Sequence, residues 1–435
     1  MDLPLGEGPP DKRKRVLSGM RPTGRLHVGH YFGALQNWVR LQDDPQRQYE
    51  CFFFIADWHA LTSDYADTSA VAQNTVEVAI DYLAAGVDPD KCTLFLQSSV
   101  PEHAELHLLL SMVTPLGWLE RVPTYKEALD NVKDKDLHTY GFFGYPVLES
   151  ADIVMYGDPE TELLVPVGED QVAHVELTRE IVRRFNFFYG FDISEELFRN
   201  PKSLSAVLDR VGSAGPRAAG SINPATIRAE IRRKAEETGL ENFMASAGDL
   251  SRFFSTTHVL REPNVMLTHT PRIPGLDGRK MSKSYGNSIT LSETDESIRS
   301  KTRAMMTDPA RKRRTDPGNP ELCPVFDWHK LFSPRETLSW ASGGCVTAGI
   351  GCIECKAAMA DHLIRWIEPV RQRRVDYQQQ PDHVLEILDT GSKRARIVAQ
   401  ESMDRVREAI FHWPEKRAEI AGGSREIAKD VPARS

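Results

Sequence analysis

Two histidines with a valine and a glycine between them, His27 to His30, stand near the start of the chain. They follow a short apolar segment at 15–18 that reads as a β-strand, and they open a segment at 28–41 that reads as a helix. A helix N-terminus offers unpaired N–H groups and the positive end of the helix dipole, which suits phosphate oxygens. Gly29 leaves room for a flat purine, and both imidazoles can donate hydrogen bonds. The pattern predicts a nucleotide phosphate site, with a metal-binding histidine pair as the alternative.

A second group of reactive side chains lies about 250 residues further on. Lys280 and Lys283 flank Met281 and Ser282 in a Gly- and Ser-rich stretch at 278–287. A mobile basic loop can close over a pyrophosphate group and neutralise the charge that develops there. The lysines by themselves would favour an ordinary basic surface loop, but the two motifs together are much more specific.

Four of the six cysteines cluster in the last third of the chain: Cys323, Cys345, Cys352 and Cys355. Disulfides are unexpected in the cytoplasmic protein that the rest of the sequence predicts, so clustered thiols indicate a metal centre. The C-x2-C pair suits either Zn²⁺ or an iron–sulfur cluster, and the residues alone do not separate the two. Cys51 and Cys92 lie in apolar segments and are predicted to be core residues.

The composition is that of a globular protein of two or three domains, with 435 residues, 27% of them charged and 40% hydrophobic. It excludes a disordered chain, a collagen and a small disulfide scaffold. No apolar run approaches the ~20 residues of a membrane helix, and residues 1–10 form no signal peptide, so we expect a cytoplasmic protein with no membrane partner. Residues 1–300 carry 31 Lys and Arg against 43 Asp and Glu, whereas residues 301–435 carry 23 against 19. A phosphate-rich partner would therefore meet the last third more favourably.

Hydrophobic periodicity predicts an α/β fold in the first half of the chain. Strands are expected at 15–18, 51–56 and 93–97, and helices at 28–41, 69–85, 103–112 and 172–188. This alternation is typical of a doubly wound parallel sheet. The alternation of strands and helices ends after residue 190. A Gly- and Ser-rich link is expected at 212–221, and a helix at 227–237. Strand and loop return at 263–300, and helices are expected at 361–379 and 393–411.

The two motifs together resemble the HIGH and KMSKS signatures of the class I aminoacyl-tRNA synthetases. Longer stretches narrow the resemblance to the bacterial tryptophanyl-tRNA synthetases: 18–30, 54–62, 144–156, 165–180 and 278–287. The similarity covers nearly the whole chain except 193–262. It implies a Rossmann-like (HUP) catalytic domain at 14–192 and 263–300, an insertion of unknown role at 193–262, and an all-helical C-terminal anticodon-binding domain at 301–435.

The resemblance also implies an activity and its partners. ATP and Mg²⁺ would serve to activate L-tryptophan as an adenylate, and the tryptophan would then pass to tRNA(Trp). The tryptophan carboxylate would attack the α-phosphate in line, so catalysis would rest on positioning and charge neutralisation rather than on a covalent nucleophile. A homodimer is expected on the same basis.

Asp152 is the residue that the resemblance assigns to the indole. Indole has one N–H donor and no acceptor, so a tryptophan pocket needs an acceptor in an apolar cavity. Asp152 lies in an apolar, helix-like stretch at 144–156, where a lone Asp would otherwise be a surface residue. A site with such an acceptor rejects phenylalanine, and similar effects reach about 10⁴–10⁵-fold. Tyrosine must be excluded by shape.

The remaining roles also come from the resemblance. Tyr145 and Gln171 would bind the α-amino group, and His59 would lie near the substrate unless it is a core histidine. The groups expected to act on the reacting phosphates are His27, His30, Lys280 and Lys283. The ATP site is expected to comprise Arg21, Pro22, Thr23, Gly29, His30, Gly168, Glu169, Asp170, Ile273, Lys280, Met281, Ser282, Lys283 and Ser284. Glu149 stands where relatives carry an uncharged residue, so we expect it to point away or to bind a cation such as Arg121.

For the four cysteines, the resemblance favours a 4Fe–4S cluster beside the anticodon-binding region, with zinc as the alternative and free thiols after that. The basic run Arg311–Arg314 could meet tRNA phosphates or be a solvated surface. Trp328, Trp340 and Trp366 could stack on anticodon bases, although at least two of them are expected in the core.

Three rival functions remain open from the sequence. A tyrosyl-tRNA synthetase shares the architecture. A small-metabolite nucleotidyltransferase shares the histidine motif but typically lacks the lysine loop and the helical domain. A non-catalytic synthetase-like paralogue would usually lose motif residues, and both motifs are intact here.

Overall fold

A five-stranded parallel sheet forms the centre of the molecule, in the strand order β3-β2-β1-β4-β7. The computed structural model describes residues 13–46, 48–131, 135–210, 223–268, 273–414 and 416–421. The strands are β1 (Arg13–Met20), β2 (Tyr49–Ile55), β3 (Thr93–Leu96), β4 (Thr161–Val167) and β7 (Asn264–Leu267). This arrangement confirms the predicted doubly wound α/β fold.

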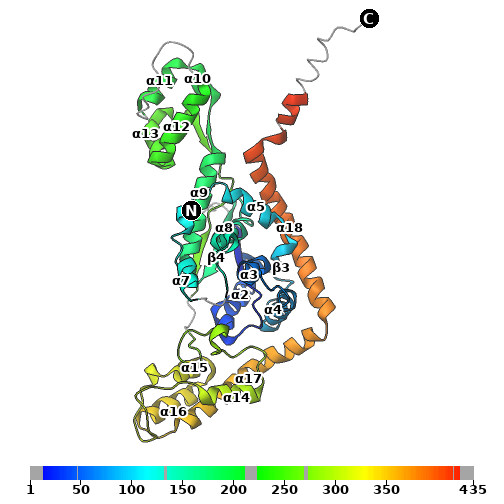
Figure 1. The fold of residues 1–435 in the computed structure, drawn as a ribbon, viewed down its shortest axis with the longest axis vertical. Helices are drawn as coiled ribbons and strands as arrows, with labels where there is room; N and C mark the ends of the chain where they lie inside the picture. Colours follow the sequence, from blue (N-terminus) through cyan, green and yellow to red (C-terminus); the bar gives the residue numbers. More distant parts are fainter. Residues whose placement is uncertain are drawn as a thin grey trace, which may run out of the picture.

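Helices cover both faces of the sheet, as Figure 1 shows. Alternate residues of β2 enter different cores: Phe53 packs in the core that includes helix residues Trp38 and Leu83, and Phe52 in the core that includes Val147 and Ile181. One face carries α1 (Val28–His30), α2 (Gln36–Gln42) and α4 (Val71–Ala85), and the other carries α5 (Glu102–Ser111), α8 (Tyr140–Val154) and α9 (Val172–Gly190). Burial on both faces explains the continuous apolar run of β2.

The helix predicted at 28–41 is broken into three parts. A π-helical turn at Tyr31–Leu35 separates α1 from α2. Hydrophobic periodicity does not reveal such a turn, because the apolar residues still fall on one side. Shorter helices that the pattern did not predict are α3 (Asp57–Asp64), α6 (Leu116–Leu119) and α7 (Pro123–Asn131). Short 3₁₀ turns lie at Gln97–Ser99, Glu169–Gln171, Gly248–Phe253, Lys283–Tyr285 and Pro320–Leu322.

The insertion forms a small unit with a hydrophobic core of its own. It contains α10 (Glu195–Arg199), α11 (Pro201–Arg210), α12 (Pro224–Thr238) and α13 (Leu240–Ala247), and the antiparallel pair β5 (Phe191–Ile193) and β6 (Phe254–Thr256). Figure 1 places it at one end of the molecule, beyond α9. The helix expected at 227–237 lies within α12, and the link expected at 212–221 lies outside the described residues.

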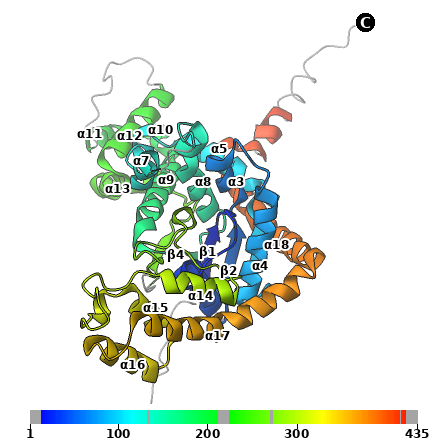
Figure 2. The same cartoon turned by 60° about the horizontal axis from the view of Figure 1, so that its bottom comes forward.

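The C-terminal helices occupy the other end and one side of the molecule (Figures 1 and 2). They are α14 (Asp295–Ala304), α15 (Pro324–Phe332), α16 (Arg335–Val346), α17 (Cys352–Gln378) and α18 (Pro381–Phe411). Helix α18 runs back along the edge of the sheet, where Ala395 and Met403 join the same core as Phe95 of β3. The helices expected at 361–379 and 393–411 therefore exist, and both begin earlier than predicted. No helix in the described ranges is both long and apolar enough to cross a membrane.

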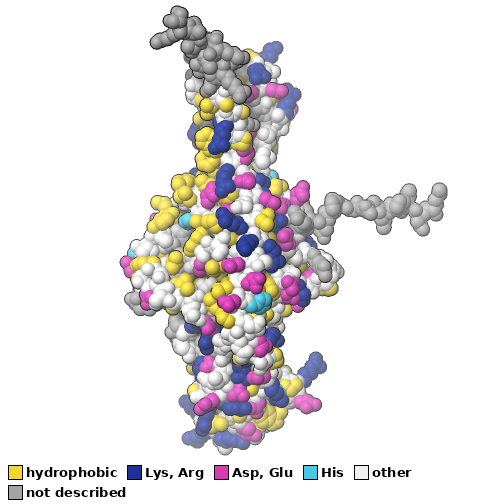
Figure 3. Space-filling model, turned by 90° about the vertical axis from the view of Figure 1, so that its right-hand side faces the viewer, with side chains coloured by type: hydrophobic (Ala, Val, Ile, Leu, Met, Phe, Trp, Pro, Cys, Tyr) yellow, Lys and Arg dark blue, Asp and Glu magenta, His cyan; other side chains and the backbone are white. Residues whose placement is uncertain are grey.

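Much of the positive charge of the last third is used inside the chain. Arg374 pairs with Asp81 at 2.7 Å, and Arg396 of α18 donates to Glu102 at 2.9 Å. Arg407 pairs with Glu105 one turn further along α5. On the side that carries α18, basic and acidic side chains are interspersed with hydrophobic ones (Figure 3). The predicted excess of positive charge therefore binds helices to the sheet as well as facing solvent.

Gly391 of α18 is the point of closest approach to the sheet. A Cβ atom there would lie 1.7 Å from the carbonyl oxygen of Leu94 in β3. We expect Gly391→Ala to force α18 away from β3 and to lower the free energy of unfolding by about 1–3 kcal/mol. Gly343→Ala in α16 is the matched control, because a Cβ there meets nothing within 4 Å. That change should be neutral or stabilise by about 0.5–1 kcal/mol. Urea unfolding followed by circular dichroism measures both, and equal effects would contradict the close contact.

Candidate active site

The candidate site lies at the carboxyl ends of β1 and β4, on either side of the point where the strand order changes direction. Open α/β sheets bind ligands at this point because the loops there leave the sheet in opposite directions. Residues 21–30 follow β1, and Gly168–Gln171 follow β4. The structure therefore brings together two segments that the sequence predicted separately.

The two histidines of the first motif hold each other in place. The backbone N–H of His30 donates to Nδ1 of His27 at 3.2 Å, and the N–H of His27 donates to Nδ1 of His30 at 3.1 Å. Their rings stack with centroids 3.6 Å apart. Since each Nδ1 is an acceptor, each neutral ring carries its proton on Nε2. Both rings can therefore donate one hydrogen bond from Nε2.

Both histidines are neutral at physiological pH. Burial, together with the charge of Lys283, lowers the pKa of His27 to about 4. Burial also lowers the pKa of His30 well below its ordinary value. They can act on phosphates as neutral donors and not as cations. The alternative of a metal-binding pair is weakened, because among the described residues no three His, Cys, Asp or Glu side chains are placed to hold an ion.

The lysine loop is docked onto the histidine loop. Nζ of Lys283 donates to the carbonyl oxygen of Gly24 at 2.7 Å. Burial lowers the pKa of Lys283 to about 8, and the nearby carboxylate of Asp81 opposes that shift. Lys280 pairs with Asp170 at 3.1 Å, although both side chains are exposed, so this contact adds little stability. The two lysines thus connect the loops after β1 and β4.

Backbone hydrogen bonds fix the two loops to each other. The N–H of Val28 donates to Ile289 O at 3.0 Å, and the N–H of Leu291 donates to Leu26 O at 2.8 Å. This short ladder holds the histidine motif against the segment that follows the lysine loop. The lysines and histidines are therefore parts of one bonded unit.

The other predicted nucleotide residues surround this unit. Met281 is buried, and its sulfur would lie 3.3 Å from a Cβ on Gly29, so a larger residue at 29 would be crowded. The N–H of Ser282 donates to Asn287 at 2.8 Å. Ile273 and Pro22 are buried, whereas Arg21, Thr23, Glu169 and Asp170 are exposed at the mouth. The side chain of Ser284 is outside the described part of the structure.

Asp152 lies at the centre of a buried hydrogen-bond network. His59 of α3 contacts one of its oxygens at 2.8 Å, and Nδ1 of His103 of α5 contacts the other at 2.6 Å. Nε2 of Gln97 reaches both oxygens at 2.9 Å. Nε2 of His103 in turn contacts the hydroxyl of Tyr156 at 2.8 Å. The network joins α3, α5 and α8 at the carboxyl end of the sheet.

The carboxylate of Asp152 is ionised despite its complete burial. Burial by itself would raise its pKa, but the hydrogen bonds from His103 and His59 outweigh burial and lower the pKa to about 2. A carboxylate has about four acceptor positions. His103 and His59 use one each, and Gln97 shares a single nitrogen between the two oxygens. The shared contact is the weakest of the set, because one N–H cannot align with both oxygens.

Tyr145 and Gln171 meet through His174. The hydroxyl of Tyr145 contacts Nε2 of His174 at 3.2 Å, and Nδ1 of His174 contacts Oε1 of Gln171 at 3.0 Å. Glu149 is half-buried, and its carboxylate lies 4.0 Å from Nδ1 of the same histidine. Glu149 thus lies beside His174, and its pairing with a cation such as Arg121 stays a prediction.

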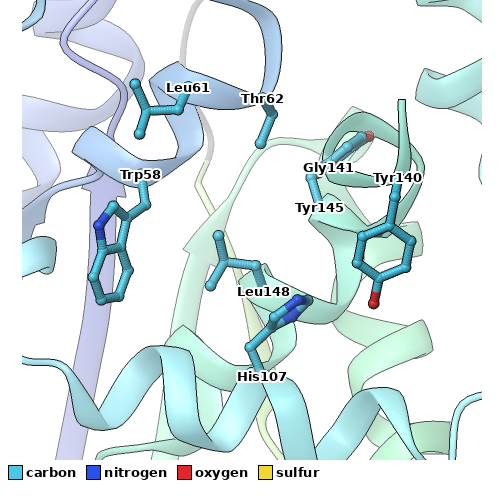
Figure 4. A pocket seen from close by; sticks show the side chains of 9 residues that line it. Trp58, Leu61, Thr62, His107, Tyr140, Gly141, Tyr145 and Leu148 are labelled. Carbon is cyan, nitrogen blue, oxygen red and sulfur yellow. The ribbon is translucent and has the colours of Figure 1, made fainter. Parts of the chain in front are cut away.

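A pocket of about 250 Å³ is lined by residues of α3, α5 and α8, the helices that the Asp152 network joins. Figure 4 shows His107 and Leu148 in its middle, between Trp58 and Tyr140. Tyr145 lines the same pocket. Nδ1 of His107 is buried without a hydrogen-bond partner among the described residues. The pocket is thus lined by aromatic and apolar surface together with polar groups of residues such as Thr62, Tyr140 and His107.

Several residues of the site were missed by sequence reasoning. Gln97 and His103 are completely buried and hold Asp152, and His174 connects Tyr145 with Gln171. Gln97 is the last residue of the predicted strand at 93–97 and directly follows the observed β3, where side chains reach the carboxyl edge of the sheet. That position was the signal that could have identified it.

The four clustered cysteines lie close enough to influence one another. Burial raises the pKa of Cys355 to about 12, and the charges of the other three thiols add to that shift. Sγ of Cys345 lies 3.8 Å from Nη1 of Arg311, and Sγ of Cys355 lies 3.4 Å from Nε2 of His329. Cys51 and Cys92 are buried core residues, as predicted.

The basic run before the cysteines has a structural role that the sequence did not predict. Arg311 is buried and donates to Ile350 O at 2.6 Å, and Arg314 donates to Ala348 O at 2.8 Å. These bonds hold the turn that precedes Cys352. Among the tryptophans, Trp328 is fully buried and Trp366 packs against Phe32, whereas Trp340 is exposed.

Comparison with known proteins assigns this geometry to a family. A model of the class I tRNA synthetases for tryptophan and tyrosine matches residues 10–211 and 241–367. A tryptophan–tRNA ligase of Ralstonia nicotianae is 49% identical over 410 residues, which cover 91% of this chain and 98% of the relative. One from Thermotoga maritima is 42% identical, with the same two coverages.

A solved structure shows the same likeness in three dimensions. The tryptophanyl-tRNA synthetase of Campylobacter jejuni, complexed with ADP and tryptophan, has a TM-score of 0.66 and 28% sequence identity. The similarity covers 91% of this chain and 99% of that one. The likeness therefore extends over the sheet, the loops and the C-terminal helices together.

Proposed function

The chain belongs to the class I tRNA synthetases that serve tryptophan and tyrosine, and on that premise we infer that it is a tryptophan–tRNA ligase. It activates L-tryptophan with ATP and transfers it to tRNA(Trp). The observation that carries this function is the docking of the lysine loop on the histidine loop, with Lys283 bonded to Gly24 O at 2.7 Å. The names of the curated relatives favour tryptophan over tyrosine as the amino acid.

ATP would bind where the two loops meet. The free Nε2–H groups of His27 and His30 would donate to phosphate oxygens, and Lys283 would leave Gly24 O to pair with them. Lys280 and Asp170 would stand at the ribose side of the mouth, with Gly168 and Glu169 beside them. The buried Ile273 and Met281 offer apolar surface for adenine.

Activation needs the tryptophan carboxylate in line with the α-phosphate. The chain contributes by holding both reactants and by stabilising charge on the pyrophosphate that leaves. Mg²⁺ would reduce the repulsion between phosphates, and it binds largely through substrate phosphates and water. The neutral histidines suit a site that also binds Mg²⁺, because they donate hydrogen bonds to the phosphates without competing with that ion.

Tryptophan would bind against Asp152, with its indole N–H as donor. Gln97 holds that carboxylate by a shared contact, so a shift of Gln97 to one oxygen frees an acceptor position at small cost. His59 and His103 would keep the carboxylate charged and oriented. Tyr145 and Gln171, joined through His174, would meet the α-amino group at the other end of the pocket.

We propose that the cysteine site holds a 4Fe–4S cluster. Cys323, Cys345, Cys352 and Cys355 provide the four thiolates that such clusters use. The neighbouring Arg311 suits their negative charge. No group of three or more His, Cys, Asp or Glu side chains in the described ranges is placed to hold a metal ion, so the proposal rests on the spacing of the four cysteines in the sequence. The cluster would lie at the start of α17 and brace the predicted anticodon-binding helices.

A homodimer is the proposed assembly, and an exposed apolar face supports it. Leu108 of α5, Met112 just after it, Leu116 of α6 and Tyr140 of α8 are all exposed. Exposed apolar patches of this kind commonly mark protein interfaces. The cytoplasmic location is proposed because charged tRNA is used in translation. The insertion at 193–262 keeps no assigned role.

The amino acid and the role of Asp152 can be tested by tRNA charging. The protein should charge tRNA(Trp) with tryptophan and not with tyrosine. Asp152→Asn should lower kcat/KM for tryptophan about 100-fold, because an amide offers one oxygen and presents a donor to the network. The exposed Asp90→Asn is the control and should leave charging unchanged. Wild-type charging with tyrosine, or full activity of Asp152→Asn, would refute this assignment.

The lowered pKa of Lys283 predicts a pH dependence of ATP binding. Its amine is protonated below about pH 8 and loses its charge above that value. The KM for ATP should therefore rise as the pH increases beyond 8, whereas His27 and His30 stay neutral between pH 6 and 8 and add no change there.

Lys283→Arg should abolish that rise, since arginine does not titrate in this range. Lys280→Arg is the matched control and should keep it, because the exposed Lys280 does not cause the dependence. If the two variants behave alike, Lys283 is not the titrating group.

Anaerobic purification tests the cluster. The protein should be brown, with broad visible absorption and about four irons per chain. Cys352→Ser should lose most of the iron, and Cys92→Ala, a core cysteine, should retain it. A colourless protein that contains zinc would overturn the cluster in favour of a zinc site.

A further inference from the structure

A buried ion pair joins the C-terminal helices to the helix behind the histidine loop. Arg374 of α17 is 2% exposed and Asp81 of α4 is fully buried. Nη1 of Arg374 donates to Oδ1 of Asp81 at 2.7 Å. The two residues are 293 positions apart in the sequence. Neither one is among the residues proposed to touch ATP or tryptophan.

The second oxygen of Asp81 holds the histidine loop. Oδ2 accepts the backbone N–H of Leu26 at 2.6 Å, and Leu26 directly precedes His27. Leu26 also takes part in the ladder to the lysine loop, since its carbonyl accepts from Leu291. The carboxylate of Asp81 therefore bonds both to α17 and to the backbone of the histidine loop.

A second contact runs parallel to the first. The guanidinium of Arg374 also pairs with Glu77, one turn earlier on α4, and Glu77 pairs with Arg25 at 3.0 Å. Arg25 is the residue before Leu26. Two successive residues of the loop are thus each held by a carboxylate that pairs with the same arginine.

Helix α17 connects this pair with distant parts of the molecule. It spans 27 residues, or about 40 Å at the usual rise. Its first turn carries Cys352 and Cys355, and its middle carries Trp366, which packs on Tyr31 and Phe32 just after the histidine motif. Its last turns carry Arg374. The helix therefore contacts the histidine segment directly through Trp366 and indirectly through Arg374 and Asp81.

The protonation of Asp81 depends on the charged groups that surround it. Burial raises the pKa of Asp81 to about 6, while Arg374 and the N–H of Leu26 act in the opposite direction and Glu77 adds to the rise. Lys283 also faces this carboxylate. Removal of Arg374 would leave a buried carboxylate without its cation, which is costly and would displace it or protonate it.

We propose that Arg374 is a positioning residue of the ATP site, which acts through Asp81 to hold Leu26 and thereby orient His27 and His30. The C-terminal helices then set the geometry of the phosphate loop as well as serving the predicted anticodon contacts. The proposal rests on the proposed function, since it takes the histidine loop to be the ATP site. A buried ion pair is weak evidence for stability by itself, so the test must separate positioning from folding.

Calorimetric titration with ATP and with tryptophan provides that separation, because it needs no turnover. Arg374→Met should weaken ATP binding about tenfold, the usual cost of one unsatisfied buried partner. Binding of tryptophan should change less than about twofold, since Asp152 lies on the other face of the sheet. Arg374→Lys should fall between Arg374→Met and the wild type, because it keeps the charge but not the paired N–H groups.

Arg373→Met is the matched control. Arg373 is the neighbour of Arg374 on α17 and also bonds α4, through Ala84 O at 2.7 Å, but this bond reaches neither Asp81 nor Leu26. It should leave ATP binding unchanged. Asp81→Asn should weaken ATP binding as well, and the double variant with Arg374→Met should be no weaker than the weaker single variant, because both act through one chain of contacts.

Unchanged ATP binding in Arg374→Met, an equal loss in Arg373→Met, or single effects that multiply in the double variant would each overturn the proposal. If Arg374→Met does not fold, the comparison of Arg374→Lys with Arg373→Met decides the question by the same criteria. Failure of the proposed function would look different: the wild-type protein would bind ATP but would not exchange pyrophosphate with tryptophan present.

Discussion

Two buried carboxylates, one on each face of the sheet, hold together the segments that form the site. Asp81 of α4 receives donors from the histidine loop and from α17, and Asp152 of α8 receives donors from α3, α5 and the end of β3. A buried carboxylate must be satisfied by partners, because its desolvation is costly. These two side chains therefore constrain loops that the sheet alone would leave free to move. The site opens where the strand order changes direction between β1 and β4, and the two carboxylates hold the segments on either side of it in place.

The electrostatics of the site follow from this burial. The same desolvation that makes the imidazoles of His27 and His30 neutral also lowers the pKa of Lys283 to about 8. Lys283 is still mostly protonated at neutral pH, and the phosphates of ATP would stabilise its charged form further. A chain with a net charge of −8 can therefore still present a cation to a polyanion at this place.

The sequence predicted the sheet and the two loops because both leave local signals. Apolar runs such as 51–56 mark buried strands, and the histidine and lysine motifs carry their chemistry in a few adjacent residues. The pairing of Arg374 with Asp81 leaves no local signal, because it depends on how α17 packs across α4. His103 was missed for the same reason, since its importance comes from its partner Asp152. The π-helical turn at 31–35 was hidden because it does not disturb the apolar pattern.

The central claim is that the docked loops and the Asp152 network form one site that activates tryptophan. Amino-acid-dependent exchange of pyrophosphate into ATP, measured with each of the twenty amino acids, tests it most directly. The account predicts exchange with tryptophan alone. Exchange with tyrosine would keep the fold and the ATP chemistry but contradict the role given to Asp152. The absence of exchange with every amino acid, in folded protein with its cysteine site intact and tRNA supplied, would contradict the account as a whole.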